Sequence, residues 1–291
     1  MRYSIAFAAA ALASSVSAHG VITQVQGANG VNMPGLSIID GTPRDSGNPL
    51  SGSEADTSII RAKEMGGKAS ALGRTQGGGA IDAGAAIAKF MGTAGNAAGA
   101  GAAGRAANRR GLLDALTGGK AGAGGAAAAA GTKTPKGTKE TGVAAAAGQG
   151  ASSGLPTTAD DGTITMTFHQ VNQDGAGPLA AAIDATSGGT DPAAFQKATV
   201  TQDVPGIGIG GLSAAAVMDF PVTVQMPQGM TCQGTAGGAQ NVCIVRMQNA
   251  ALAGPFGGSA AFTQSTAAKK RAVEYNLRKR HMARGILGKP E

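Results

Sequence analysis

Large aromatic side chains are scarce in this sequence. The 291 residues include no Trp, two Tyr and seven Phe, against 49 Gly. A packed core needs large apolar side chains, and here they concentrate in residues 19–90 and 155–262. We therefore expect one domain, residues 19–266, rather than several.

Long apolar runs are also missing. Beyond the first residues, no stretch of about 18 apolar residues is free of glycine or charge, so we expect no membrane anchor. The one early apolar run, Ile5–Leu12, follows Arg2 and precedes Val16-Ser17-Ala18. A basic start, a short apolar segment and small residues before the cut are typical of a secretory signal peptide. Residues 1–18 are therefore predicted to be removed, which leaves His19 as the mature amino terminus.

Cysteine is limited to Cys232 and Cys243. In a secreted protein such a pair most simply forms a disulfide, and extended segments at Val222–Met226 and Val242–Met247 favour a bridge across a hairpin loop. No CxxC spacing accompanies them, which argues against a zinc site.

Positive charge is confined to one end of the chain. The net charge is +7, but residues 267–291 hold eight Lys and Arg against two Glu, and Arg2 leaves with the signal peptide. The body from residue 19 to 266 is therefore neutral, which argues against nucleic-acid binding. The basic tail is expected to be solvated, either as an amphipathic helix or without fixed structure.

Residues 92–154 are dominated by Gly and Ala, as in GTAGNAAGAGAAGRAANRRG. Glycine at this density disfavours a helix, and the few large apolar residues give no stripe to bury. We predict a disordered, low-complexity insertion at about 92–154.

The strand signals follow this insertion. In TITMTFHQV, residues 163–171, Ile164, Met166 and Phe168 alternate with threonines and His169, which is the period of a half-buried strand. The segments FPVTVQM, NVCIVRMQ and SAAFTQS also indicate strands, and a short helix is expected at residues 80–91. Short strands with Gly and Pro between them predict an all-β sandwich with long loops.

Histidine offers the main candidate for chemistry, and there are three: His19, His169 and His281. His281 lies in the basic tail. An amino-terminal histidine can chelate a metal through its α-amine and its Nδ1 atom, and a second histidine completes three nitrogens that suit Cu(II). This arrangement is a histidine brace, and His169 is the candidate second ligand. The alternatives are an accidental histidine at a cleavage site and a hydrogen-bonded surface histidine.

Several ordered motifs resemble a family of secreted fungal proteins, the MAS-type appressorium-associated virulence factors. The motifs are AHGVITQVQGANG, DTSIIRAKEMGG, GRTQGGGAID, TITMTFHQVNQDGAGP, VPGIGIGG, FPVTVQMPQGMTCQG and QNVCIVRMQNAALAGPFGGSAAFTQ. The mature His-Gly start, the strand histidine and GPFGGSAAF also resemble lytic polysaccharide monooxygenases. That resemblance implies an immunoglobulin-like sandwich with a copper site on a flat surface. It assigns His19 and His169 as copper ligands and Phe256, or less favourably Phe262, as the axial aromatic.

Two functions follow as hypotheses. The first is a copper-dependent oxidoreductase that acts on cell-wall polysaccharide. The second is a non-enzymatic secreted factor that acts at the fungal or host surface. Under either hypothesis we expect an extracellular or cell-wall location, a monomer, and cell-wall polysaccharide or a host surface as partner.

Overall fold

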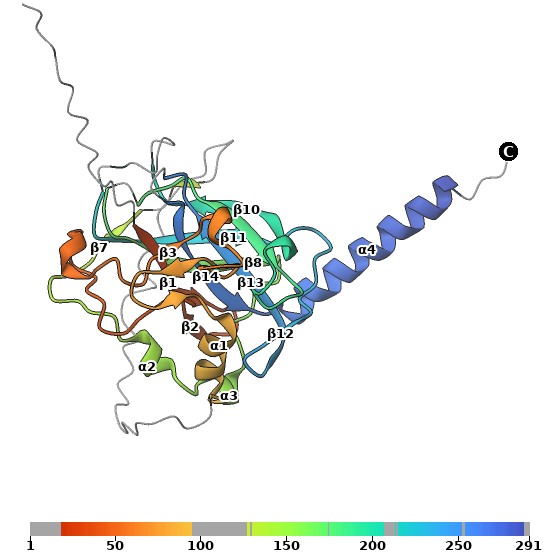
Figure 1. Cartoon of the computed structure of the whole chain (residues 1–291). Coiled ribbons are helices and arrows are strands. Elements are labelled where there is room, and N and C mark those ends of the chain that lie inside the picture. Colours follow the sequence, from red (N-terminus) through yellow and green to blue (C-terminus); the bar gives the residue numbers. More distant parts are fainter. Residues whose placement is uncertain are drawn as a thin grey trace, which may run out of the picture.

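A computed structural model describes residues 19–94, 127–128, 130–173, 175–206, 213, 215–251 and 254–287. The described chain is mostly antiparallel β-sheet with few helices (Figure 1). This confirms the predicted all-β sandwich. The predicted signal peptide lies outside the described residues and stays a prediction.

The first sheet has the strand order β2-β1-β8-β11-β10. Its strands are β2 (Asn32–Pro34), β1 (Gly20–Gln26), β8 (Thr163–Gln170), β11 (Met218–Gln225) and β10 (Phe195–Asp203). In β8 the alternation predicted from the sequence is present: Ile164, Met166 and Phe168 are buried in the core, while the threonines between them are half-buried.

The second sheet continues from β10 through β9 (Ala180–Asp184), β13 (Ala239–Gln248), β14 (Phe256–Phe262), β3 (Ser58–Ile59), β4 (Arg74–Thr75) and β5 (Gly79–Ala80). Strand β10 belongs to both sheets. Its first half pairs with β9 and its second half with β11, where the register shifts between Val200 and Gln202. A bulge of this kind bends a strand, which lets one strand turn the corner of the sandwich.

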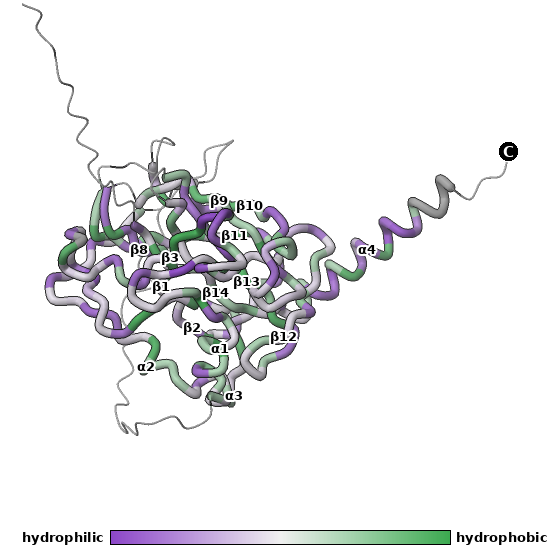
Figure 2. The backbone as a smooth tube through the Cα atoms, viewed as in Figure 1, coloured by the Kyte–Doolittle hydropathy of each residue, from purple (hydrophilic) through white to green (hydrophobic). Residues whose placement is uncertain are grey.

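Small residues in β14 allow the two layers to pack closely. The strand reads FGGSAAF and is buried throughout. A side chain at Gly258 would place its Cβ 2.5 Å from the backbone nitrogen of Ile22 in β1. The close approach of backbones therefore compensates for the scarcity of aromatic side chains. The buried apolar side chains form one large core cluster, and Figure 2 shows hydrophobic and hydrophilic residues mixed along the strands.

The last part of the predicted insertion, residues 130–154, contains regular elements, which corrects the prediction of disorder there. It contains β7 (Thr132–Lys133), α2 (Gly142–Ala146) and α3 (Gly150–Ser153), and β6 (Ala127–Ala128) precedes it. Strand β7 pairs with β11, and the Asp40 carboxylate accepts hydrogen bonds from the first backbone N–H groups of α2. Tertiary partners rather than helix propensity hold this segment. Residues 95–126 lie outside the described residues.

The remaining elements agree in part with expectation. Helix α1 (Ala83–Met91) confirms the predicted short helix; Asp82 caps it and Gly92 ends it with a φ of 70°. The 3₁₀-helices are η1 (Pro49–Ser51), η2 (Ala62–Glu64) and η3 (Pro192–Ala194).

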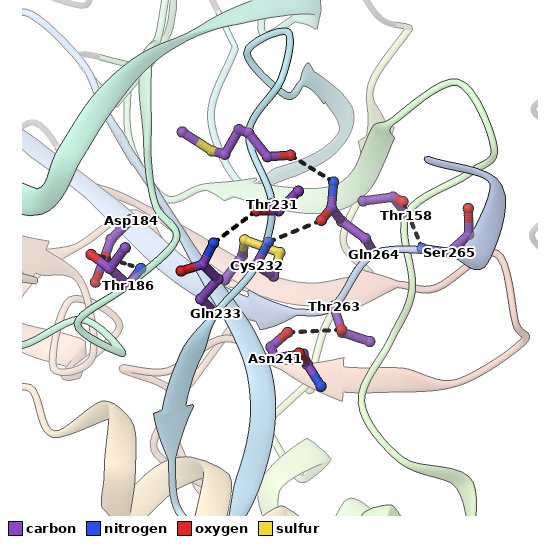
Figure 3. Close-up of a disulfide and its surroundings, with 12 residues drawn as sticks. Thr158, Asp184, Thr186, Thr231, Cys232, Gln233, Asn241, Thr263, Gln264 and Ser265 are labelled. Carbon is purple, nitrogen blue, oxygen red and sulfur yellow. Dashed lines mark hydrogen bonds between the residues drawn. A yellow bond between two sulfur atoms is a disulfide. The ribbon is translucent and has the colours of Figure 1, made fainter. Parts of the chain in front are cut away.

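The predicted disulfide between Cys232 and Cys243 is present, with a Cα–Cα distance of 5.1 Å (Figure 3). It spans the hairpin of β12 (Gly234–Ala236) and β13. The expected flanking segment at Val222–Met226 is not its partner strand, because β11 pairs with β8 and β10 instead. Gln264 secures the bridge by accepting a hydrogen bond from the backbone N–H of Cys232.

The basic tail forms helix α4 (Thr266–Leu287), which projects away from the sandwich (Figure 1). Its first turns pack against the body, where Ala268 and Ala272 are buried. Among the described residues, no helix is long and apolar enough to cross a membrane.

Candidate histidine site

The register of β1 and β8 brings His19 and His169 to the same end of the sheet. His169 lies directly opposite Val21. His19 is two residues before Val21, and its carbonyl accepts a hydrogen bond from the backbone N–H of Val171 at 3.0 Å. The backbones of the two histidines therefore lie at the same end of the β1–β8 ladder, two residue positions apart.

His19 is enclosed by polar and aromatic groups from distant segments. Its backbone N–H donates to Asn172 Oδ1 at 2.8 Å, and its Nδ1 lies 3.2 Å from Glu54 Oε1. The Asn172 amide also donates to Glu54 Oε1 at 3.1 Å, which links the two groups. The ring of Phe256 lies against His19, with 4.4 Å between the ring centroids.

The ring of His169 is held through its Nδ1 atom. Its Nδ1 lies 2.7 Å from Asp219 Oδ1 on the neighbouring strand β11. Its Nε2 is buried and has no hydrogen-bond partner in the described part of the chain. A carboxylate that accepts the Nδ1 proton leaves the lone pair of the neutral ring on Nε2, as in many metal-binding histidines.

Both histidines are buried, with exposed fractions of 2% for His19 and 1% for His169. The site therefore differs from the flat, open surface that the resemblance to monooxygenases implies. The reason lies in the covering segments, because the loop that carries Glu54 and the strand that carries Phe256 both pack onto His19.

The two remaining candidates lie elsewhere. Phe262 is fully buried in the core opposite Cys243, six residues along β14 from Phe256. Six residues of strand span about 20 Å, so Phe262 is too distant to serve beside His19. His281 is exposed on α4.

A buried ion-pair network supports the Glu54 loop. Arg44 donates to Asp56, two residues after Glu54, and also to Glu140 of the 130–154 segment. Burial lowers the pKa of Arg44, but hydrogen bonds and charges from Asp56 and Glu140 outweigh it and hold the pKa above its ordinary value. The Arg44 guanidinium therefore joins the loop beside His19 to the 130–154 segment.

The sequence did not indicate Glu54, Asn172 or Asp219 as neighbours of the histidines. Their only signal is position: Asn172 follows β8 by two residues, and Asp219 occupies an outward position of β11. Among the described residues, no group of three or more His, Cys, Asp or Glu side chains is placed to hold a metal ion. A histidine brace needs only two imidazoles, since its third ligand is a terminal amine.

Comparison with known proteins places the chain in a family. The model for the Egh16-like virulence factor family matches residues 17–257. The appressoria-specific virulence factor GAS2 of Pyricularia oryzae is 61% identical over 288 residues, which cover 98% of this chain and 97% of GAS2. GAS1 of the same fungus is 39% identical over 131 residues, or 44% of this chain and 51% of GAS1.

No solved structure matches. The resemblance to lytic polysaccharide monooxygenases is not shown by these matches and stays a hypothesis. The resemblance to appressorium-associated virulence factors is confirmed, and the chain belongs to the Egh16-like virulence factor family.

Proposed function

We propose that this protein is a secreted, infection-associated factor that binds one copper ion through His19 and His169. The observation that carries the proposal is the buried Nε2 of His169, which has no hydrogen-bond partner in the described residues and belongs to the end of the β1–β8 ladder where His19 lies. The names of the relatives support a role in infection. The Cys232–Cys243 disulfide supports an oxidising, extracellular compartment.

The donor set fits a copper ion. The ligands would be the α-amine and Nδ1 of His19, released by cleavage after Ala18, together with Nε2 of His169. Two imidazoles and an amine are borderline ligands that suit Cu(II). Bound copper would supply one-electron chemistry toward the strong C–H bonds of a cell-wall polysaccharide.

The surrounding residues would prepare this site before the metal arrives. Asp219 fixes the orientation of the His169 ring, and Asn172 Oδ1 orients the nitrogen of His19. Glu54 places a negative charge beside Nδ1 of His19, which favours a cation there. Phe256 covers the ring of His19 and would be an aromatic neighbour of a bound metal.

Copper titration of the secreted protein tests the proposal. Protein whose amino-terminal sequence begins at His19 should bind one Cu(II) and give an EPR spectrum with nitrogen hyperfine splitting. His169→Ala should change that spectrum and weaken binding at least tenfold, whereas His281→Ala, the matched control on α4, should do neither. Stoichiometric binding that His169→Ala leaves unchanged would refute the brace.

A second candidate is a non-enzymatic factor that acts at the fungal or host surface. The burial of both histidines favours it, because a polymer cannot reach either ring directly. Product analysis decides between the two. Oxidised oligosaccharides released from chitin, cellulose or pectin in the presence of copper and a reductant indicate an enzyme, and their absence with intact copper binding indicates the non-enzymatic role.

A further inference from the structure

A polar groove of about 620 Å³ runs along the outer face of the first sheet. Its floor includes Gln24 of β1, Thr167 of β8 and Asp219 of β11. One wall comes from residues 134–149, including Thr134 and Thr141. Asp219 is the residue that holds Nδ1 of His169, so one part of the groove borders the histidine site.

The wall of the groove is fixed in place. Thr132 of β7 pairs with Asp219, and the backbone N–H of Thr134 donates to the carbonyl of Val217 at 3.1 Å. Further along, the N–H of Arg44 donates to the Thr138 carbonyl and the N–H of Glu140 to the Thr42 carbonyl, both at 2.9 Å. A ligand would therefore meet a preformed site and would not need to order this segment.

The lining of the groove is neutral and rich in hydroxyl and amide groups. Its charged residues are Arg44, Lys139, Glu140 and Asp219, which sum to no net charge, and Arg44 is already paired with Glu140 and Asp56. Among the described residues that line it, none is aromatic. The hydroxyl of Thr134 is the strongest indication of a ligand, because it is buried and has no hydrogen-bond partner among the described residues.

We infer that this groove binds a neutral, polyhydroxylated glycan chain. Hydroxyls and amides can exchange hydrogen bonds with sugar hydroxyls, and the Thr134 hydroxyl, once its side chain turns toward the groove, would gain most from such a partner. An anionic polymer would find no excess of positive charge. A peptide would find no aromatic or large aliphatic side chain among the described lining residues to pack against. The inference names a substrate class for the proposed function, but it rests on the groove and does not require copper.

The test uses metal-free protein in EDTA, titrated with cellohexaose, chitohexaose and xylohexaose and followed by NMR amide shifts. At least one neutral hexamer should shift the amides of Gln24, Thr134 and Thr167. Thr134→Val keeps the shape of the side chain and removes its hydroxyl, so it should weaken binding about three- to tenfold. Thr141→Val removes the hydroxyl of a second, exposed threonine in the groove wall and should also weaken binding. Thr235→Val on β12 is the matched control and should bind normally.

The inference is wrong if no neutral hexamer causes a saturable shift of the NMR amide signals. Stronger binding of hexagalacturonate, or of an uncharged hexapeptide, would also overturn it, as would binding that neither Thr134→Val nor Thr141→Val weakens. If no glycan binds but the copper EPR spectrum is normal, only the inference about the groove is refuted. If the protein binds glycans but does not bind copper, only the proposal of a copper site is refuted.

Discussion

The buried Arg44 offers the sharpest test of how the site is held together. Its guanidinium donates to both carboxylate oxygens of Asp56, with Nη1 2.9 Å from Oδ1, and to Glu140 Oε2. Arg44 is 3% exposed and Asp56 is fully buried. Arg44→Met keeps most of the side-chain volume but leaves the buried Asp56 carboxylate without its cationic partner.

The expected loss is large because of the charge left behind. Removing one partner of a buried pair costs about 3–5 kcal/mol of the free energy of unfolding, whereas replacing both partners by apolar residues is often nearly neutral. We therefore expect Arg44→Met to lose about 3–5 kcal/mol, and Arg44→Met with Asp56→Leu to recover much of that loss. Arg74→Met, which breaks the partly exposed contact with Glu64, is the matched control and should lose far less.

Urea unfolding followed by circular dichroism gives these free energies, and hydrogen exchange locates the effect. Amides of residues 132–146 and of the Glu54 loop should exchange faster in Arg44→Met, because the guanidinium joins these segments. A loss within about 1 kcal/mol of the wild type, or an effect equal to that of Arg74→Met, would refute the reasoning.

Three further measurements test other parts of the fold. Replacing Cys232 and Cys243 by Ala opens a short loop and should cost about 2–3 kcal/mol in urea unfolding; equal stability would contradict this. Burial opposes the charged form of Asp184, but hydrogen bonds from Ser187 and from neighbouring backbone N–H groups lower its pKa, so its stabilisation is present at neutral pH and is lost as the pH falls below about 4. Asp184→Asn should therefore be less stable than wild type at pH 7, with a gap that narrows by pH 3. Gly258→Ala should destabilise by about 1–3 kcal/mol because its Cβ would meet the backbone of β1, whereas Gly84→Ala within helix α1, whose nearest contact would be the movable Asp82 side chain at 3.2 Å, should cost less.

Strand periodicity predicted much of the sheet but not all of it. The alternation in residues 163–170 identified β8, because each apolar side chain there faces one core. The sequence pattern does not predict strands β9 and β10. The segment AAAID is short and dominated by alanine, and FQKATVTQD has only three buried or half-buried apolar positions. The order of residues 130–154 was also missed, since it depends on contacts with Asp40, Arg44 and β11 rather than on local composition.

The sequence likewise predicts only part of the candidate site. His19, His169 and Phe256 could be named from residue type and family resemblance, and the structure places Phe256 against His19 and both histidines at one end of the ladder. Their polar neighbours come from loops far away in the sequence; Asn172 is 153 residues from His19, and Glu54 reaches it from a loop that Arg44 secures. No spacing rule predicts such contacts, because they depend on how loops close over the end of the sheet.

The two proposals differ in their dependence on the amino terminus, and one variant separates them. In a chain that keeps any residue before His19, the nitrogen of His19 is an amide, which still donates to Asn172 but has no basic lone pair for a metal. A mature protein extended by one Met should therefore lose most of its copper affinity. Because the groove is lined by residues 23–219, the same variant should bind neutral hexasaccharides normally. Copper binding that survives the added Met would mean that the amine is not a ligand, and glycan binding lost with it would mean that the groove and the terminus are coupled.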